Sequence, residues 1–276
     1  MYLEKEIKNA NVLMTVKTYP GPTLSHKEVV CTAGLLDGKK WVRIYPINFR
    51  DKPYYQQFTR YSWIQLNLIK NPSDKRLESY QPEKQFDEEI KILDHIGTTN
   101  DWEERRNIIC NGEVYYSMEE VINLAKEQNR SLVTLKPREI IDFIIEEDDR
   151  DWSPAQQRIL HQESIFDYLS GEKKEIIKKI PYKYSYKFLT NGDTNPRTLM
   201  ITDWEIGALY WNGLKKYQSE EITNQKIKEK FLGNFVNNCD LYFFLGTTYR
   251  HHYVSRNPYI IIGVFYPPKE YQPKLL

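Results

Sequence analysis

The chain has 276 residues, of which 40% are apolar and 28% are charged, and its formal net charge is +1. This length and composition are typical of a folded protein with one large domain or two small ones. The small net charge excludes the strong overall positive field of many nucleic-acid-binding proteins, so a nucleic acid would have to meet a local patch.

No segment predicts a membrane anchor or a metal site. The N-terminal residues lack a basic segment followed by an apolar run, and no apolar stretch reaches 18 residues. The cysteines, Cys31, Cys110 and Cys239, are far apart and form no CxxC or Cys/His pair at the spacing of zinc ligands. We therefore expect a cytoplasmic protein with no membrane partner, no metal and no other cofactor.

The first third of the chain predicts a β-hairpin. Apolar runs at 27–36 and 40–47 flank Asp37-Gly38, which is a strong hairpin signal. Alternation in the second run places an arginine between two aromatic residues on one, exposed face: Trp41, Arg43 and Tyr45. This pattern is typical of phosphate or base recognition and equally of a guanidinium packed for stability. We include this face, with Arg50 after it, in a candidate nucleic-acid surface.

Another strand and a polar turn follow. Residues 61–69 alternate between apolar and polar, and the turn NPSDKRLES comes directly after them. Arg76, Glu78 and Tyr80 gather at the end of this turn. We interpret them as a solvated turn with a surface ion pair.

The middle of the chain is more helical. Ser117-x-x-Glu120 fits a capping box, and Ser153-Pro154 predicts the start of a helix that runs to about 169. Residues 139–145 between these helices predict a buried strand. Because the composition changes to lysine and tyrosine near Gly171, we divide the chain into 1–170, which is β-rich with helices, and 171–276, an α+β portion.

The segment 182–189 predicts a strand with an aromatic face and a basic face. Its aromatic residues alternate with Lys183 and Lys187. Lysines in a groove would contact phosphates, whereas lysines facing water would keep a sheet edge soluble. Both interpretations stay open, and we include the two lysines in the candidate nucleic-acid surface.

Two carboxylates precede the next predicted helix. Asp203 and Glu205 are candidate catalytic groups, but Thr202-x-x-Glu205 is also a capping box, and the helix dipole stabilises acidic residues in a first turn. The capping interpretation is the favoured one. A further helix is predicted at about 219–235.

The segment 242–268 predicts two buried strands around a polar loop. Such a loop has a rigid base and is open to a partner. The candidate binding residues are Thr247, Arg250 and His251. Neighbouring residues on an extended chain point to opposite sides, so His251 and His252 are not expected to bind one metal ion together. The alternative is a polar loop whose histidines cap strand ends.

Four segments carry a family resemblance: CTAGLLDGKKWVRIYPINFR, IPYKYSYKF, DWEIGALY and the pair FFLGTT and IIIGVFYPP. Together they resemble an uncharacterised family of bacterial proteins over most of the chain. The CTAG and WVRIYP pattern is also similar to one in bacterial proteins with paired oligonucleotide-binding-type barrels. That second resemblance implies small β-barrels that bind nucleic acid through a strand face and its loops. It assigns no catalytic residue.

These patterns predict a mixed α+β protein with two β-rich portions, for which small barrels are a candidate form, separated and flanked by helices. The leading functional hypothesis is nucleic-acid binding through aromatic and basic side chains on strand faces and loops. No P-loop, GxGxxG, GxSxG or HExxH motif is present, so the hypothesis rests on the surfaces described above.

Two other functions are kept as alternatives. One is an enzyme acting on nucleic acid or nucleotides, a metal-dependent nuclease or other hydrolase, in which Asp203, Glu205 and His251 carry the chemistry and Arg43 and Arg250 hold the phosphate. A divalent cation is expected only in that case. The other is a protein-interaction module whose exposed tyrosines form the contact surface.

Overall fold

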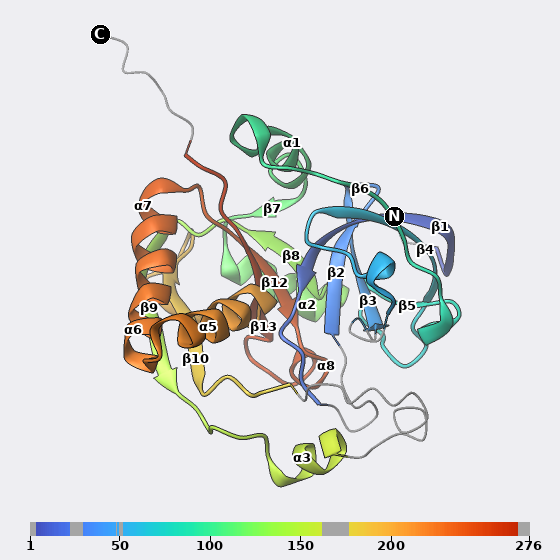
Figure 1. The fold of residues 1–276 in the computed structure, drawn as a ribbon. Coiled ribbons are helices and arrows are strands. Elements are labelled where there is room, and N and C mark those ends of the chain that lie inside the picture. The colour runs from blue at the N-terminus through green and yellow to red at the C-terminus, as the bar shows by residue number, and fades with distance from the viewer. Residues whose placement is uncertain (1–3, 23–29, 48, 50–51, 162–176, 270–276) are drawn as a thin grey trace.

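A computed structural model describes residues 4–22, 30–47, 49, 52–161 and 177–269. The protein is a mixed α+β structure with two β-rich portions, which confirms the predicted class (Figure 1). Within the described residues, no helix has the length and apolar character needed to cross a membrane.

The first portion is a closed barrel. Its strands are β1 (Glu6–Lys17), β2 (Val30–Leu36), β3 (Lys40–Ile47), β4 (Ser62–Lys70) and β5 (Ser79–Pro82). They pair in the order β1-β2-β3-β5-β4, and β4 pairs again with β1, which closes the ring. The pairing of β3 with β5 is parallel and the others are antiparallel. A sixth strand, β6 (Lys91–His95), continues along β4.

The predicted hairpin forms β2 and β3. Asp37 and Gly38 both have positive φ, 48° and 69°, and with Lys39 they form the three-residue connection between the two strands. Apolar side chains from every strand fill the barrel, among them Val12, Ile44, Ile64, Leu68 and Tyr80. The predicted strand at 61–69 is β4, with Ile64, Leu66 and Leu68 facing this core.

A helical connection leads to the second portion. It contains α1 (Thr99–Ile109), the short strand β7 (Val114–Tyr115) and α2 (Met118–Gln128). Ser117 is the N-cap of α2 and accepts a hydrogen bond from the Glu120 backbone N–H, which confirms that predicted helix start.

The second portion has strands β8 (Leu132–Leu135), β9 (Glu139–Glu147), β10 (Tyr182–Leu189), β11 (Arg197–Met200), β12 (Tyr242–Thr247) and β13 (Tyr259–Phe265). β9 pairs with β10, β10 with β11, β12 with β13, and β12 with β8. Ile201, just after β11, makes a parallel bridge to Ile261 in β13. If β8 and β9 are counted together as one bent first strand, the strands of the second unit pair in the order first, second, third, fifth, fourth and back to the first. The strands of the first barrel pair in the same order.

This pairing moves the boundary between the portions. The sequence suggested a division near residue 171, but β9 and β10, which lie on either side of that position, are hydrogen-bonded neighbours. The two β-rich units instead meet around the α1–α2 connection. A composition change between two paired strands therefore did not mark a domain boundary.

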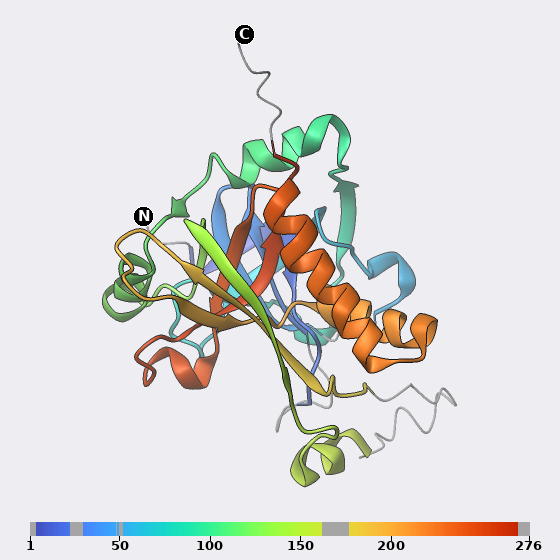
Figure 2. The same ribbon diagram turned by 90° about the vertical axis from the view of Figure 1, so that its left-hand side faces the viewer.

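The predicted aromatic face of β10 points into the second portion. Tyr184, Tyr186 and Phe188 are buried, and the Tyr186 hydroxyl donates a hydrogen bond to the Phe231 carbonyl at 2.8 Å. Phe231 lies in η4 (Glu229–Asn234), a π-helical turn that joins α6 (Glu220–Lys228) to α7 (Phe235–Asn238). The predicted single helix at 219–235 is therefore three consecutive segments. Figure 2 shows this orange run on one side of β9 and β10, with α8 (Tyr249–His252) on the other.

Two further helices complete the second portion. α3 (Pro154–His161) is the described part of the helix predicted to reach about 169; the rest lies outside the described residues. α5 (Trp204–Tyr217) connects β11 to α6.

The two β-rich portions pack together through an apolar layer. The layer includes side chains from the outer surface of β1, β2 and β3 and from β12 and β13: Leu13, Leu35, Trp41, Phe244, Ile262 and Phe265. Trp41 is only 7% exposed and meets Phe244 edge to face, with ring centroids 5.2 Å apart. The prediction that Trp41 and Arg43 form an exposed face is therefore wrong, because the second portion covers it.

Candidate nucleic-acid interface

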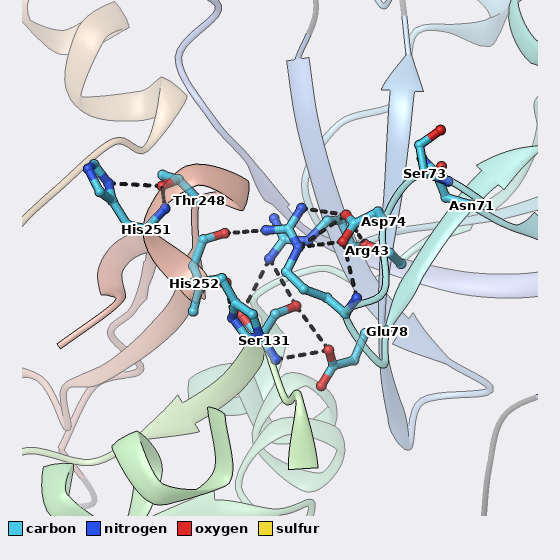
Figure 3. A network of polar contacts seen from close by, with 12 residues as sticks. Arg43, Asn71, Ser73, Asp74, Glu78, Ser131, Thr248, His251 and His252 are labelled. Carbon is cyan, nitrogen blue, oxygen red and sulfur yellow. Dashed lines mark hydrogen bonds and ion pairs between the residues drawn. The ribbon is translucent and has the colours of Figure 1, made fainter. Parts of the chain in front are cut away.

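Two loops at equivalent positions in the two units meet in space. Residues 71–78 join β4 to β5, and residues 248–258 join β12 to β13. Arg76 crosses between them: its Nη1 donates a hydrogen bond to the Thr247 carbonyl at 2.6 Å, and its guanidinium lies 5.8 Å from the Tyr249 ring centroid. The two polar segments that the sequence analysis treated separately thus belong to one site (Figure 3).

Asp74 holds the Arg76 guanidinium in place. Arg76 donates from Nε to both Asp74 oxygens at 2.9 and 3.0 Å, and its Nη2 lies 2.5 Å from Asp74 Oδ2. Ser79 Oγ donates to the same carboxylate. Burial disfavours the charged carboxylate, but the hydrogen bonds from Arg76 and Ser79 outweigh it and lower the pKa of Asp74. The turn was predicted to be solvated with a surface ion pair. Its Arg76 is instead only 7% exposed and forms a buried ion pair with Asp74.

Arg43 belongs to the same network (Figure 3). Its Nη2 donates to the Ser131 carbonyl at 3.3 Å and to Ser131 Oγ at 3.2 Å, while Ser131 N and Oγ both donate to Glu78 Oε2 at 2.9 Å. Burial, followed by the neighbouring Arg76 cation, lowers the pKa of Arg43 to about 10, so it stays charged at neutral pH. Arg43 thus connects β3 to the start of β8.

The remaining residues of the predicted Trp-Arg-Tyr face have different positions. Tyr45 is half-buried on β3. Arg50 lies outside the described residues.

The two neighbouring histidines lie in different surroundings. Thr248 caps the short helix α8 and accepts a hydrogen bond from the His251 backbone N–H. His251 is exposed and points away from the network, whereas His252 is buried in it and its Nδ1 is hydrogen-bonded to Thr247 Oγ1 at 2.9 Å (Figure 3).

His252 and Thr247 are structural parts of the site. Burial, followed by the nearby Arg76, lowers the pKa of His252 to about 4, so its imidazole is neutral at physiological pH. Within the described residues its Nε2 is buried without a hydrogen-bond partner. Thr247 is also buried, and its backbone N–H donates to the Ser131 carbonyl at 3.0 Å. Thr247 therefore positions the loop and does not present its side chain to a ligand.

The outer side of the joined loops is aromatic and basic. We call its exposed aromatic and basic side chains the rim: Lys75, Tyr249, Arg250, His251, Tyr253 and Arg256. Tyr249 and Tyr253 are 57% and 52% exposed, and their rings meet edge to face at 6.3 Å. The segment 241–268 contains no acidic residue. Of the predicted binding residues, Arg250 and His251 lie on the rim.

The β10 lysines lie elsewhere and face carboxylates. Lys183 forms an ion pair with Asp148 at 2.9 Å, and this hydrogen bond raises the pKa of Lys183. Lys187 is directly opposite Asp142 in the pairing of β10 with β9. These contacts favour the interpretation in which the lysines keep the strand surface soluble.

The candidate catalytic carboxylates cap a helix. Asp203 is the N-cap of α5 and accepts a hydrogen bond from the Glu205 backbone N–H at 3.1 Å. The capping interpretation holds, with the cap at Asp203 and not at Thr202. Both carboxylates also contact Arg60, each at 3.0 Å. Among the described side chains, His251 is hydrogen-bonded to Thr248 and not to this pair, and no group of three potential ligands is placed to hold a metal ion.

Sequence reasoning did not identify Asp74 and Ser131 as parts of the site. Asp74 looked like an ordinary turn residue, and Ser131 precedes β8 with no motif around it. The available signal was that the two units repeat one strand order, which places the β4–β5 and β12–β13 loops at equivalent positions. This repeat becomes visible only when β8 and β9 are counted as one strand.

Two family descriptions match consecutive parts of the chain. The domain of unknown function DUF8758 matches residues 8–111, which contain the first barrel and α1, and the domain of unknown function DUF8757 matches residues 114–276. The curated proteins contain no match to the chain. The DUF8757 match covers more than half of the chain, and the chain therefore belongs to the family of this domain of unknown function.

Proposed function

We propose that the protein binds single-stranded nucleic acid on the rim. The observation that carries this proposal is the exposed Tyr249–Tyr253 pair set among basic side chains, in a segment without acidic residues. Proteins that bind single strands combine aromatic stacking platforms for the bases with cations that follow the phosphates. Unpaired bases fit this surface better than a duplex, whose bases are already stacked on each other.

The connectivity of the two units also supports the proposal. A five-stranded ring in which the third and fifth strands are parallel is the arrangement of the oligonucleotide-binding barrel, to which the N-terminal segment shows a sequence resemblance. Such barrels bind oligonucleotides or oligosaccharides through the face of strands two and three and through their loops, including the loop between strands four and five. The rim is made by that loop from each unit. This support is an analogy between folds and ranks below the rim chemistry.

The proposed binding surface differs from the one inferred from sequence. Trp41, Arg43 and Thr247 are buried, so in this proposal Arg250 and His251 contact the ligand and these three residues do not. The charged face of β10 is left out because Lys183 is paired with Asp148. The ligand surface is therefore compact and confined to the joined loops.

Fluorescence anisotropy with labelled single-stranded and duplex oligonucleotides, repeated over a salt series, tests the proposal. We expect tighter binding to single strands and an affinity that falls steeply as salt rises. Base stacking on an aromatic side chain contributes about 1–3 kcal/mol per base. The double variant Tyr249→Ala/Tyr253→Ala should therefore bind at least about tenfold more weakly.

The chain offers a matched control. Tyr54 and Tyr55, in the connection between β3 and β4, are 90% and 70% exposed and lie outside the rim. Their replacement by alanine removes two exposed aromatic rings and should leave the affinity unchanged. Equal losses for the two double variants, or no measurable binding by the wild type, would contradict the proposal.

A further inference from the structure

We infer that Arg76 is a positioning residue for the rim: it acts from the first barrel to set the conformation of the binding loop of the second unit. This inference rests on the proposed function, because it names the residue that prepares the same site. The binding surface is then not the property of one barrel. Each unit supplies a part that the other lacks.

The burial and the contacts of Arg76 argue against a direct role in holding a ligand phosphate. Its Nε and Nη2 are engaged by Asp74, and its Nη1 donates to the Thr247 carbonyl. The side chain is buried, and its charge is balanced by the Asp74 carboxylate. Arg76 can therefore influence a ligand only through the residues that it holds.

Arg76 acts on the rim through its hydrogen bond to Thr247. Thr247 is the last residue of β12, and Thr248, which caps α8, follows it directly. Within the described residues, Arg76 makes the one side-chain hydrogen bond between the 71–78 loop and residues 247–258, which are the end of β12 and the loop after it. By fixing the Thr247 carbonyl and lying beside the Tyr249 ring, it sets the direction in which α8 leaves the strand.

The direction of α8 matters because α8 carries the stacking residues. Tyr249 is in its first turn and Tyr253 follows its end, so a change in the start of α8 displaces both rings. A binding loop that is already in its bound conformation avoids the entropic cost of ordering when the ligand arrives. Loss of Arg76 should therefore weaken binding although no ligand contact is removed.

The test compares two arginine variants in the full chain. Asp74→Asn/Arg76→Gln removes both charges together, so no buried charge is left unpaired, while Arg250→Gln removes an exposed cation of the rim. The probe is a labelled single-stranded oligonucleotide in a salt series. We expect the first variant to bind about tenfold more weakly with an unchanged slope of log affinity against log salt, and the second to reduce that slope by about one.

Hydrogen exchange without ligand provides a second readout. The His252 backbone N–H donates to the Thr248 carbonyl at 3.0 Å and reports on α8. Its exchange should be faster in Asp74→Asn/Arg76→Gln and unchanged in Arg250→Gln. If the wild type binds no oligonucleotide but this exchange still increases, the proposed function fails and the control of the loop by Arg76 stands.

Other outcomes overturn the inference itself. Wild-type affinity in the double variant, a salt slope reduced as in Arg250→Gln, or unchanged exchange at His252 would each do so. If the double variant does not fold, Arg76→Lys replaces it. Lysine keeps a charge beside Asp74 but cannot supply both the two-point contact with Asp74 and a donor to Thr247, so the same loss at constant slope is expected.

Discussion

The outer face of β3 and the rim have similar chemistry and opposite surroundings. Trp41 and Arg43 on β3 are 7% and 5% exposed, whereas Tyr249 on the rim is 57% exposed. β12 and its neighbours cover the first surface, and no described segment covers the second in this way. An aromatic and basic composition therefore indicates a surface made for contact, while the tertiary structure decides whether its partner is a ligand or the chain itself.

The largest expected effect tests the buried side of this comparison. Trp41→Ala should lower the free energy of unfolding by about 3–5 kcal/mol, because it removes a large side chain from the packed layer between the units. Urea-induced unfolding followed by circular dichroism measures the change. A loss below 1 kcal/mol would mean that this face is not a structural interface, and the contrast with the rim would disappear.

Local patterns in the sequence predicted most of the strands and caps. Asp37-Gly38 identified the hairpin, alternation identified the buried aromatic face of β10, and Ser117 identified the start of α2. Each of these features depends on residues close together in the chain. Trp41 was misplaced because alternation assigns it to the face opposite Val42 but says nothing about what covers that face.

Only one of the two loops of the candidate site was predicted as a site, because the 71–78 loop was interpreted as a solvated turn. Arg76 and Thr247 are 171 positions apart, and no local signal reports a hydrogen bond over that distance. The exposed residues Arg250 and His251 could be chosen by type. The supporting residues Asp74 and Ser131 could not, because their importance comes from burial between two units that the sequence divided at the wrong position.

A smaller effect concerns the two neighbouring histidines of α8, of which His252 is buried and His251 is exposed. The folded-state pKa of His252 is lowered to about 4 from an ordinary value near 6.5, so the unfolded state binds a proton more readily. The stabilising contribution is fully present above about pH 6.5 and is lost as the pH falls toward 4. It amounts to at most about 3 kcal/mol.

The histidine pair contains its own control for this pH dependence. In unfolding experiments between pH 7 and pH 4, His252→Gln should lose less stability on acidification than the wild type does. His251→Gln should follow the wild type because His251 is exposed. If the two variants gave identical pH profiles, the neighbouring histidines would not differ in the way that their burial indicates.

The smallest expected effect makes the comparison most informative. Tyr249→Ala and Tyr253→Ala should each change the free energy of unfolding by no more than about 0.5 kcal/mol, because both side chains are largely exposed. Thermal and urea unfolding measure this. If stability is unchanged while oligonucleotide affinity falls, the loss of affinity comes from the missing rings and not from a disturbed fold. A stability loss as large as that of Trp41→Ala would instead mean that the rim tyrosines, like Trp41, are needed to hold the fold. They would then keep α8 in place and could not be assigned to a ligand.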